Sequence, residues 1–254
     1  MRKMLIASLL AVCVLPSALA QATPDANALR AANAVVGVML EALVDRGRET
    51  LPPVKAQTLA SPALVNMTPD QRQRVSDLVE TFPDRLRNAV EQRLPPVDLS
   101  TLPPEVAAHI AAYVAQHPEA GRTAPLPEQA LAAQIAQMFT PADLPAIADF
   151  LETPSGRAVI ALLEAQTLRQ ALHPTLDGLS PADHDALTAF AATAPGHAFS
   201  TQLGTLFDDA NQDMGASMGS QYATFMGGVS ADLCTIVGHD GCVGFITSGG
   251  MGAN

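Results

Sequence analysis

Apolar residues recur every three or four positions along most of this chain, which is the spacing that places them on one face of an α-helix. The longest pattern extends over about residues 26–48, and the alternation typical of strands is scarce. Five apolar stripes stand out: Val35, Val36, Met39, Leu40 and Leu43; Val75, Leu78, Phe82, Leu86, Val90 and Leu94; Leu131, Ile135 and Met138; Ile147, Phe150 and Leu151; and Val159, Leu162 and Leu163. The pattern predicts an all-α fold of about eight to ten helices.

Five pairs of a hydroxyl residue and a following proline have the pattern of a helix N-cap followed by the first helical residue. The hydroxyl accepts an unpaired backbone N–H, and proline has no N–H to lose there. The five pairs are Ser61-Pro62, Thr68-Pro69, Thr140-Pro141, Thr153-Pro154 and Ser180-Pro181. We expect a helix to begin at each pair and a kink at Pro83. Linkers are expected at the proline-rich joints 52–53, 95–96 and 103–104.

The segment that begins at residue 139 repeats at an offset of 40 residues. Eight of the twenty positions from 139 to 158 are identical to their equivalents from 179 to 198. The repeated motif comprises Thr140, Pro141, Phe150, Thr153, Pro154 and Gly156 in the first copy and Ser180, Pro181, Phe190 and Gly196 in the second. Each unit, about 139–172 and 179–213, is expected to fold as helix, tight turn and helix. We therefore predict a compact multi-helix domain with a duplicated helical hairpin.

The repeated glycine lies in the first turn of the second helix of each predicted hairpin. A missing side chain there lets two helices approach closely, and it also leaves room for an anion at the helix N-terminus. Close packing is favoured at Gly156 and Gly196, because no cluster of basic residues accompanies the turn at 196.

The first copy contains Phe139-Thr140-Pro141-Ala142-Asp143-Leu144 and then Phe150-Leu151-Glu152-Thr153-Pro154-Ser155-Gly156-Arg157. With these motifs, residues 129–172 resemble the core of the bacterial envelope family called "domain of unknown function 2059", and residues 179–199 form a second copy. The resemblance implies an all-helical, exported protein. It supplies no catalytic residues, because the family has no established activity. The chain departs from the family at Leu151, where an aromatic residue is common, and in its glycine-rich end.

The first twenty residues have the pattern of a signal peptide. Arg2 and Lys3 supply a basic start, an apolar run follows from Met4 to Leu15, and Ala18-Leu19-Ala20 fits the cleavage pattern. We expect cleavage after Ala20 and a location in the periplasm or outside the cell. The alternative is an uncleaved membrane anchor, for which the apolar run is short. No transmembrane helix is expected in the mature chain.

The chain is acidic, with 14 basic and 25 acidic residues and a formal charge of −11. Loss of residues 1–20 removes two basic residues and leaves −13 on the mature chain. Such a chain lacks the basic stripe that nucleic-acid binding requires, so nucleic acid is excluded as a partner. An apolar content of 48% and a charged content of 15% exclude a charge-rich disordered protein.

Composition changes near residues 196–214. All 20 prolines lie at or before Pro195, whereas 11 of the 17 glycines lie at or after Gly204. We therefore expect three parts: a signal peptide over 1–20, a helical domain over 21–213 and a Gly-rich C-terminal segment over 214–254.

The only cysteines of the predicted mature chain are Cys234 and Cys242. An oxidising compartment favours a disulfide between them. Two alternatives are free thiols and a metal site with His239, which lacks a suitable fourth ligand. A short helix capped by Ser230 is expected to end at Gly238, so that the bridge ties this helix to the residues that follow.

An apolar stripe runs through the C-terminal segment at helical spacing. It comprises Met214, Met218, Tyr222, Phe225, Met226, Val229, Leu233 and Ile236. Methionine adapts to irregular partners, so one interpretation is a docking helix for an envelope protein or an apolar ligand. The favoured alternative is that the stripe packs on the helical core.

Two motifs suggest other chemistry but lack essential parts. Gly215-Ala216-Ser217-Met218-Gly219 matches G-x-S-x-G, yet Asp232 and His239 follow within 22 residues and no strand-turn-helix pattern surrounds it. Asp209, Asn211 and Asp213 open a calcium-loop pattern whose glycine and glutamate positions hold other residues. No catalytic residue, metal or cofactor is therefore assigned. The sequence favours a non-enzymatic binding module for a partner protein or an apolar ligand, with a hydrolase using Ser217 or a structural scaffold as alternatives.

Overall fold

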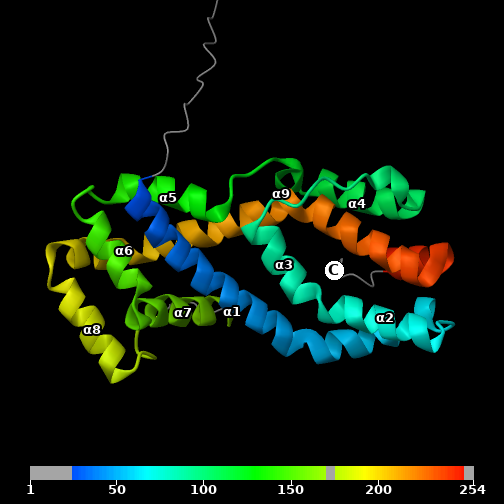
Figure 1. Ribbon diagram of the computed structural model, residues 1–254, viewed down its shortest axis with the longest axis horizontal. Coiled ribbons are helices and arrows are strands. Elements are labelled where there is room, and N and C mark those ends of the chain that lie inside the picture. Colours follow the sequence, from blue (N-terminus) through cyan, green and yellow to red (C-terminus); the bar gives the residue numbers. More distant parts are fainter. Residues whose placement is uncertain (1–24, 170–174, 249–254) are drawn as a thin grey trace, which may run out of the picture.

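The computed structural model describes residues 25–169 and 175–248 and is all-α within these ranges (Figure 1). The nine α-helices of the described chain are α1 (Ala26–Leu59), α2 (Pro69–Glu80), α3 (Phe82–Glu91), α4 (Pro104–Gln116), α5 (Pro127–Met138), α6 (Leu144–Glu152), α7 (Pro154–Leu168), α8 (Pro181–Ala191) and α9 (Ala194–Thr247). Three short 3-10 helices connect them: η1 (Pro62–Leu64), η2 (Leu99–Thr101) and η3 (Pro118–Gly121). The predicted fold class and number of helices are confirmed for this part of the chain.

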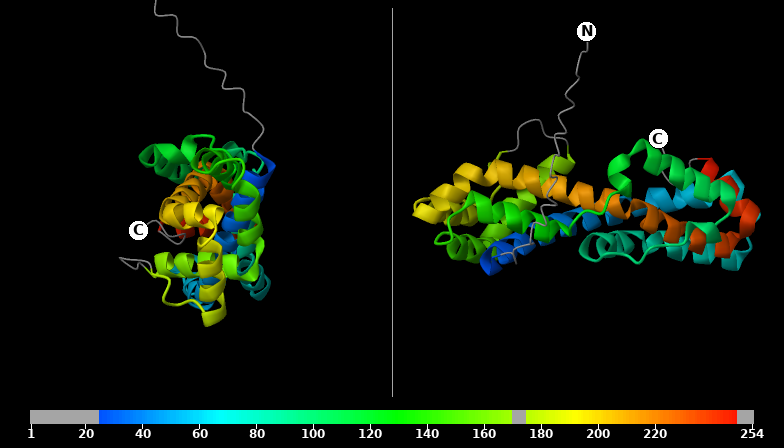
Figure 2. Two further views of the ribbon diagram at one scale, coloured as in Figure 1. Left: turned by 90° about the vertical axis from the view of Figure 1, so that its left-hand side faces the viewer. Right: turned by 90° about the horizontal axis from the view of Figure 1, so that it is seen from above.

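The two longest helices, α1 and α9, extend along the long axis of an elongated molecule (Figures 1 and 2). A first core gathers at one end, where α5, α6, α7 and α8 pack against the N-terminal parts of α1 and α9. A second core lies at the other end, where η1, α2 and α4 pack against the C-terminal part of α9. The long helices therefore link two apolar cores, and each core excludes water from one face of α9.

Three of the five predicted N-caps are confirmed. The backbone N–H groups of Gln71, Gly156 and Asp183 donate to the hydroxyls of Thr68, Thr153 and Ser180 at 3.2, 3.0 and 3.2 Å. At Thr68 the Gln71 side chain also accepts from the backbone N–H of Thr68 at 2.9 Å, which completes a capping box.

The other two predicted helix starts are wrong. Ser61 precedes only the three-residue η1 and makes no capping hydrogen bond. Helix α6 begins at Leu144 rather than at Pro141, and the Thr140 hydroxyl donates to the Asp143 carboxylate at 2.6 Å. The reason lies in Pro145, which has no N–H to donate to the carbonyl of residue 141 in an earlier helical turn.

The predicted linker at residues 52–53 is also wrong, because α1 continues through both prolines to Leu59. Proline removes helical hydrogen bonds there, so tertiary contacts must hold the second half of α1 in place. This half packs against α2 and α3, and Lys55 forms an ion pair with Glu80 of α2. The kink expected at Pro83 is confirmed, since the helix is interrupted at Thr81, between α2 and α3.

The first copy of the repeat falls on α6 and α7, the second falls on α8 and the start of α9, and the two copies meet at their aromatic residues. The rings of Phe150 and Phe190 stack with centroids 4.3 Å apart. A Cβ atom at Gly156 would lie 2.2 Å from the Phe150 carbonyl oxygen, and one at Gly196 would lie 1.8 Å from the Phe190 carbonyl oxygen. Both glycines therefore serve close packing, as expected.

The Gly-rich C-terminal segment is not structurally separate at residue 214, because that position lies inside α9. The predicted boundary is thus wrong for the described residues, and residues 249–254 lie outside them. Ser230 is buried within the same helix and does not cap a new one. The predicted break at Gly238 is present, since this residue has φ 78°.

Helices α1 and α9 are long and apolar enough to cross a membrane by length and composition. Of their most apolar windows, however, 44% and 39% of the residues are buried inside the protein. Both helices contribute apolar side chains to the cores of the protein. Length and composition alone therefore do not assign either helix to a membrane.

Candidate functional site

The C-terminal stripe points mostly into the protein. Met214 belongs to the first core, and Met226, Leu233 and Ile236 belong to the second. Tyr222 and Phe225 are partly buried against the second core, and Met218 packs beside Leu40, Val44 and Val90 in the middle of the molecule. The stripe therefore packs largely within the chain. It can contribute to a binding site only where its buried side chains border an internal pocket.

Three members of the stripe, Met226, Val229 and Leu233, line a pocket of about 810 Å³. The pocket lies between α9, the second half of α1, and helices α2 and α3. Its apolar lining also includes Leu43, Val44, Leu51, Val54, Val75, Leu78, Val79, Phe82, Leu86 and Phe245. A volume of this size falls within the range of small-molecule sites, roughly 300–1,000 Å³.

None of the described residues that line the pocket is ionisable. Its polar side chains are Thr50, Gln57, Thr58, Ser61 and Ser248. The Thr50 hydroxyl already donates to the carbonyl of Gly47 at 3.0 Å. The lining therefore offers apolar surface with a few neutral hydrogen-bonding groups and no fixed charge.

The rim of the pocket exposes large apolar side chains to solvent. Among the described residues, the large hydrophobic residues classed as exposed are Val54 (47%), Val65 (65%) and Phe82 (38%). Val54 and Phe82 both line the pocket, and the Phe82 ring meets that of Phe225 edge to face at 5.1 Å. Apolar surface therefore continues from the interior of the pocket to its mouth.

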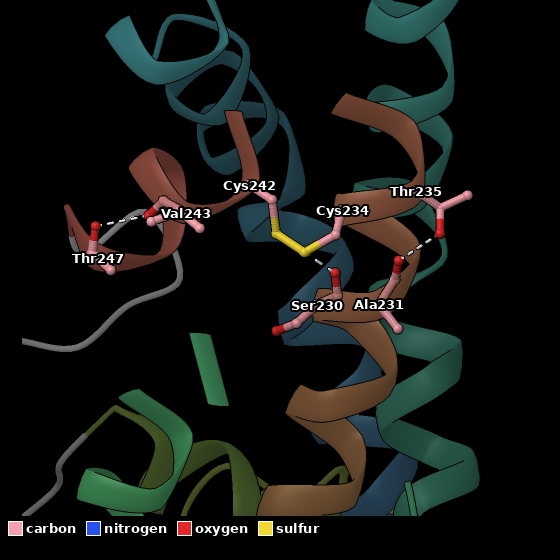
Figure 3. Close-up of a disulfide and its surroundings, with 7 residues drawn as sticks. All are labelled: Ser230, Ala231, Cys234, Thr235, Cys242, Val243 and Thr247. Atoms are coloured by element: carbon pink, nitrogen blue, oxygen red, sulfur yellow. Dashed lines mark hydrogen bonds between the residues drawn. A yellow bond between two sulfur atoms is a disulfide. The ribbon is translucent and has the colours of Figure 1, made fainter. Parts of the chain in front are cut away.

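The predicted disulfide is confirmed, since Cys234 and Cys242 are bonded with their Cα atoms 4.8 Å apart (Figure 3). This bond uses both sulfur atoms, so the metal site with His239 and the pair of free thiols are not what this structure contains. Leu233 and Phe245, which line the pocket, lie close in sequence to the two cysteines. The disulfide thus belongs to the surroundings of the pocket.

The structure does not assemble a catalytic triad around Ser217. This serine is 3% exposed and lies in the middle of α9 rather than in a strand-to-helix turn. Asp232 lies 15 residues further along the same helix, which corresponds to roughly 22 Å. The Asp232 carboxylate accepts from Arg85 at 2.7 Å in an ion pair, and His239 lies beyond the break at Gly238.

The three residues of the partial calcium motif also lie within α9 and form no loop. The Asn211 side chain donates to the carbonyl of Phe207 at 3.1 Å, and the Asp213 carboxylate accepts from Gln134 at 3.4 Å. Burial, followed by the nearby Asp209 charge, raises the pKa of Asp213 to about 6. Over residues 25–169 and 175–248, no group of three or more His, Cys, Asp or Glu side chains is placed to hold a metal ion.

Two features were missed in the sequence. The pocket was missed because α1 was expected to stop before Pro52. The sequence signal for the pocket was the helical spacing of Gly47, Leu51, Val54 and Thr58. This spacing continues one face of α1 across the two prolines. The second feature is Glu164, which is 4% exposed and whose carboxyl has a pKa raised by burial. Its position on α7 between apolar neighbours was only a weak indication that its side chain is buried.

Comparisons with family models, with curated proteins and with solved structures find no match to this chain. The resemblance to domain of unknown function 2059 therefore stays a prediction that rests on the motif residues alone.

Proposed function

We propose that this protein is a non-enzymatic binding protein whose ligand is an uncharged apolar small molecule, such as one with a medium-length hydrocarbon chain. The observation that supports this most strongly is the pocket of about 810 Å³ with no ionisable side chain among its described lining residues. An apolar pocket with a few convergent polar groups is the usual form of a small-molecule site.

The lining also favours a neutral ligand over a charged one. Transfer of an isolated charge from water into an apolar site is strongly unfavourable unless a partner of opposite charge is present. The described lining provides no such partner, whereas Gln57, Thr58 and Ser61 can hydrogen-bond a neutral hydroxyl or carbonyl group. The hydrocarbon part then contacts Leu78, Val229 and their neighbours.

A ligand is favoured over a partner protein as the occupant of the C-terminal stripe. Most of the stripe is buried in the two cores, so a partner chain has little of it to contact. Three of its buried members, Met226, Val229 and Leu233, line the pocket, where a small molecule can reach them.

Export to the periplasm or outside the cell is part of the same proposal. It is supported by the signal-peptide pattern of residues 1–20 and by the Cys234–Cys242 disulfide, since disulfides persist in oxidising compartments. Resemblance to an exported family of the bacterial envelope points the same way.

The test is a fluorescence titration of the mature protein with N-phenyl-1-naphthylamine, an uncharged apolar dye. Val54→Asp places a carboxylate on the rim of the pocket, and Val65→Asp is the matched control at an exposed valine outside the pocket. We expect Val54→Asp to weaken dye binding about tenfold, because it removes apolar contact and adds a charge. Val65→Asp should bind as the unmodified protein does. Absence of dye binding, or equal effects of both substitutions, would contradict the proposal.

A further inference from the structure

The wall that α9 contributes to the pocket comes from two pieces of the helix. Met226, Val229 and Leu233 precede Gly238, whereas Phe245 and Ser248 follow it. Gly238 adopts φ 78° and ψ 177°, a conformation that is essentially confined to glycine and is not helical. Helical hydrogen bonding is interrupted there, so the helix itself does not fix the angle between the two pieces.

The disulfide spans this break. Cys234 lies four residues before Gly238 and Cys242 lies four residues after it, on the piece that carries Phe245. Figure 3 shows the bond between the two cysteines. The Cys242 side chain is fully buried, and its Sγ atom lies 3.8 Å from the carbonyl oxygen of Ser230. The covalent link therefore holds the second piece against the first at a point next to the pocket.

The second piece also packs closely on η1, where two glycines approach Ala63 and where Phe245 and Ile246 share the second core with Leu64. A Cβ atom at Gly244 would lie 3.3 Å from the Cβ of Ala63, and one at Gly241 would lie 3.7 Å from the Ala63 carbonyl oxygen. Contacts between glycine and alanine bury little apolar area. The second piece is thus held by the burial of Phe245 and Ile246 in the second core and by the disulfide.

We infer that the Cys234–Cys242 disulfide is a positioning device that fixes residues 239–248 as the end wall of the pocket and so sets how tightly the pocket holds its ligand. This inference rests on the proposed function. A dithiol reductant opens the bond by donating two electrons and two protons, which gives two cysteine thiols and the disulfide of the reductant. The freed end wall then lets the ligand leave faster.

The experiment compares dissociation of N-phenyl-1-naphthylamine by stopped flow from three forms of the mature protein. These are the oxidised protein, the protein reduced by dithiothreitol, and the Cys234→Ser/Cys242→Ser variant. We expect dissociation to be at least about tenfold faster from the reduced protein and from the variant, because changes at a binding site act mostly on the dissociation rate. Dithiothreitol should not change the variant further, which controls for effects of the reagent elsewhere.

A second variant tests the wall without touching the disulfide. Phe245→Ala keeps the bond and removes the ring that lines the pocket, so it should also speed dissociation. Hydrogen exchange separates a local effect from unfolding: protection should fall in residues 239–247 and persist in α6 and α7. Loss of protection throughout the described chain, or equal dissociation rates with the thiols shown by mass spectrometry to be free, would overturn the inference. If the oxidised protein binds no dye at all, the proposed function fails instead.

Discussion

Substitution of Gly196 by alanine tests the packing of the second hairpin. The new Cβ would lie 1.8 Å from the Phe190 carbonyl oxygen, far inside contact distance. That oxygen cannot move away freely, because it accepts from the backbone N–H of Thr193 at 2.9 Å and from the Thr193 hydroxyl at 2.7 Å. The same hydroxyl accepts the Gly196 N–H at 3.1 Å and caps α9. Relief of the clash therefore disrupts the cap and the turn together.

The magnitude follows from these contacts. Overpacking costs about 1–3 kcal/mol and loss of an N-cap costs about 1 kcal/mol. Replacement of a helical glycine by alanine returns about 0.5–1 kcal/mol. The net expectation is a loss of about 1–3.5 kcal/mol, which lowers the melting temperature of a chain of this size by roughly 2–14 °C.

The matched control is Gly204→Ala in the same helix. An added Cβ at Gly204 meets nothing within 4 Å beyond its chain neighbours and the adjacent backbone of its own helix, so only the gain in helix stability of about 0.5–1 kcal/mol remains. Thermal denaturation followed by circular dichroism should place Gly196→Ala below the unmodified protein and Gly204→Ala slightly above it. A Gly196→Ala protein as stable as the original would refute the packing argument.

Three further predictions follow from the same structure. Thr68→Ala should lower the free energy of unfolding by about 1 kcal/mol because it removes the capping box of α2, whereas Ser61→Ala, which loses no cap bond, should change it little in urea titrations. The folded state holds the Asp213 proton more tightly than the unfolded chain, since its pKa is raised from 3.8 to about 6; stability should therefore fall as pH rises between these values, and Asp213→Asn should flatten this part of a stability–pH profile. Edman sequencing of the exported protein should begin at Gln21, and an intact N-terminal Met would contradict cleavage after Ala20.

Much of the fold could be predicted because local chemistry and tertiary packing agree. Thr68, Thr153 and Ser180 cap helices where the sequence placed them. The predictions failed where a long-range contact or a later residue changes the local preference. Contacts with α2 and α3 hold α1 together across two prolines, and Pro145 delays the start of α6 beyond Thr140.

The candidate site was only partly accessible from the sequence. The stripe on α9 could be identified by its spacing, and so could Cys234 and Cys242. Spacing does not show, however, which face of a buried helix lines a pocket. The pocket requires the second half of α1 to lie opposite Val229, which depends on how four helices meet. Only the three-dimensional arrangement shows that the described lining contains no charge.

The measurement that tests the central claim most directly is displacement of the bound dye by three ten-carbon compounds: decanol, decanoate and decyltrimethylammonium. They share one hydrocarbon chain and differ in the charge of the head group. A pocket without ionisable lining residues predicts that neutral decanol displaces the dye at the lowest concentration, with both ions weaker. Displacement in which either ion equals or exceeds decanol, or no displacement by any of the three, would contradict the account.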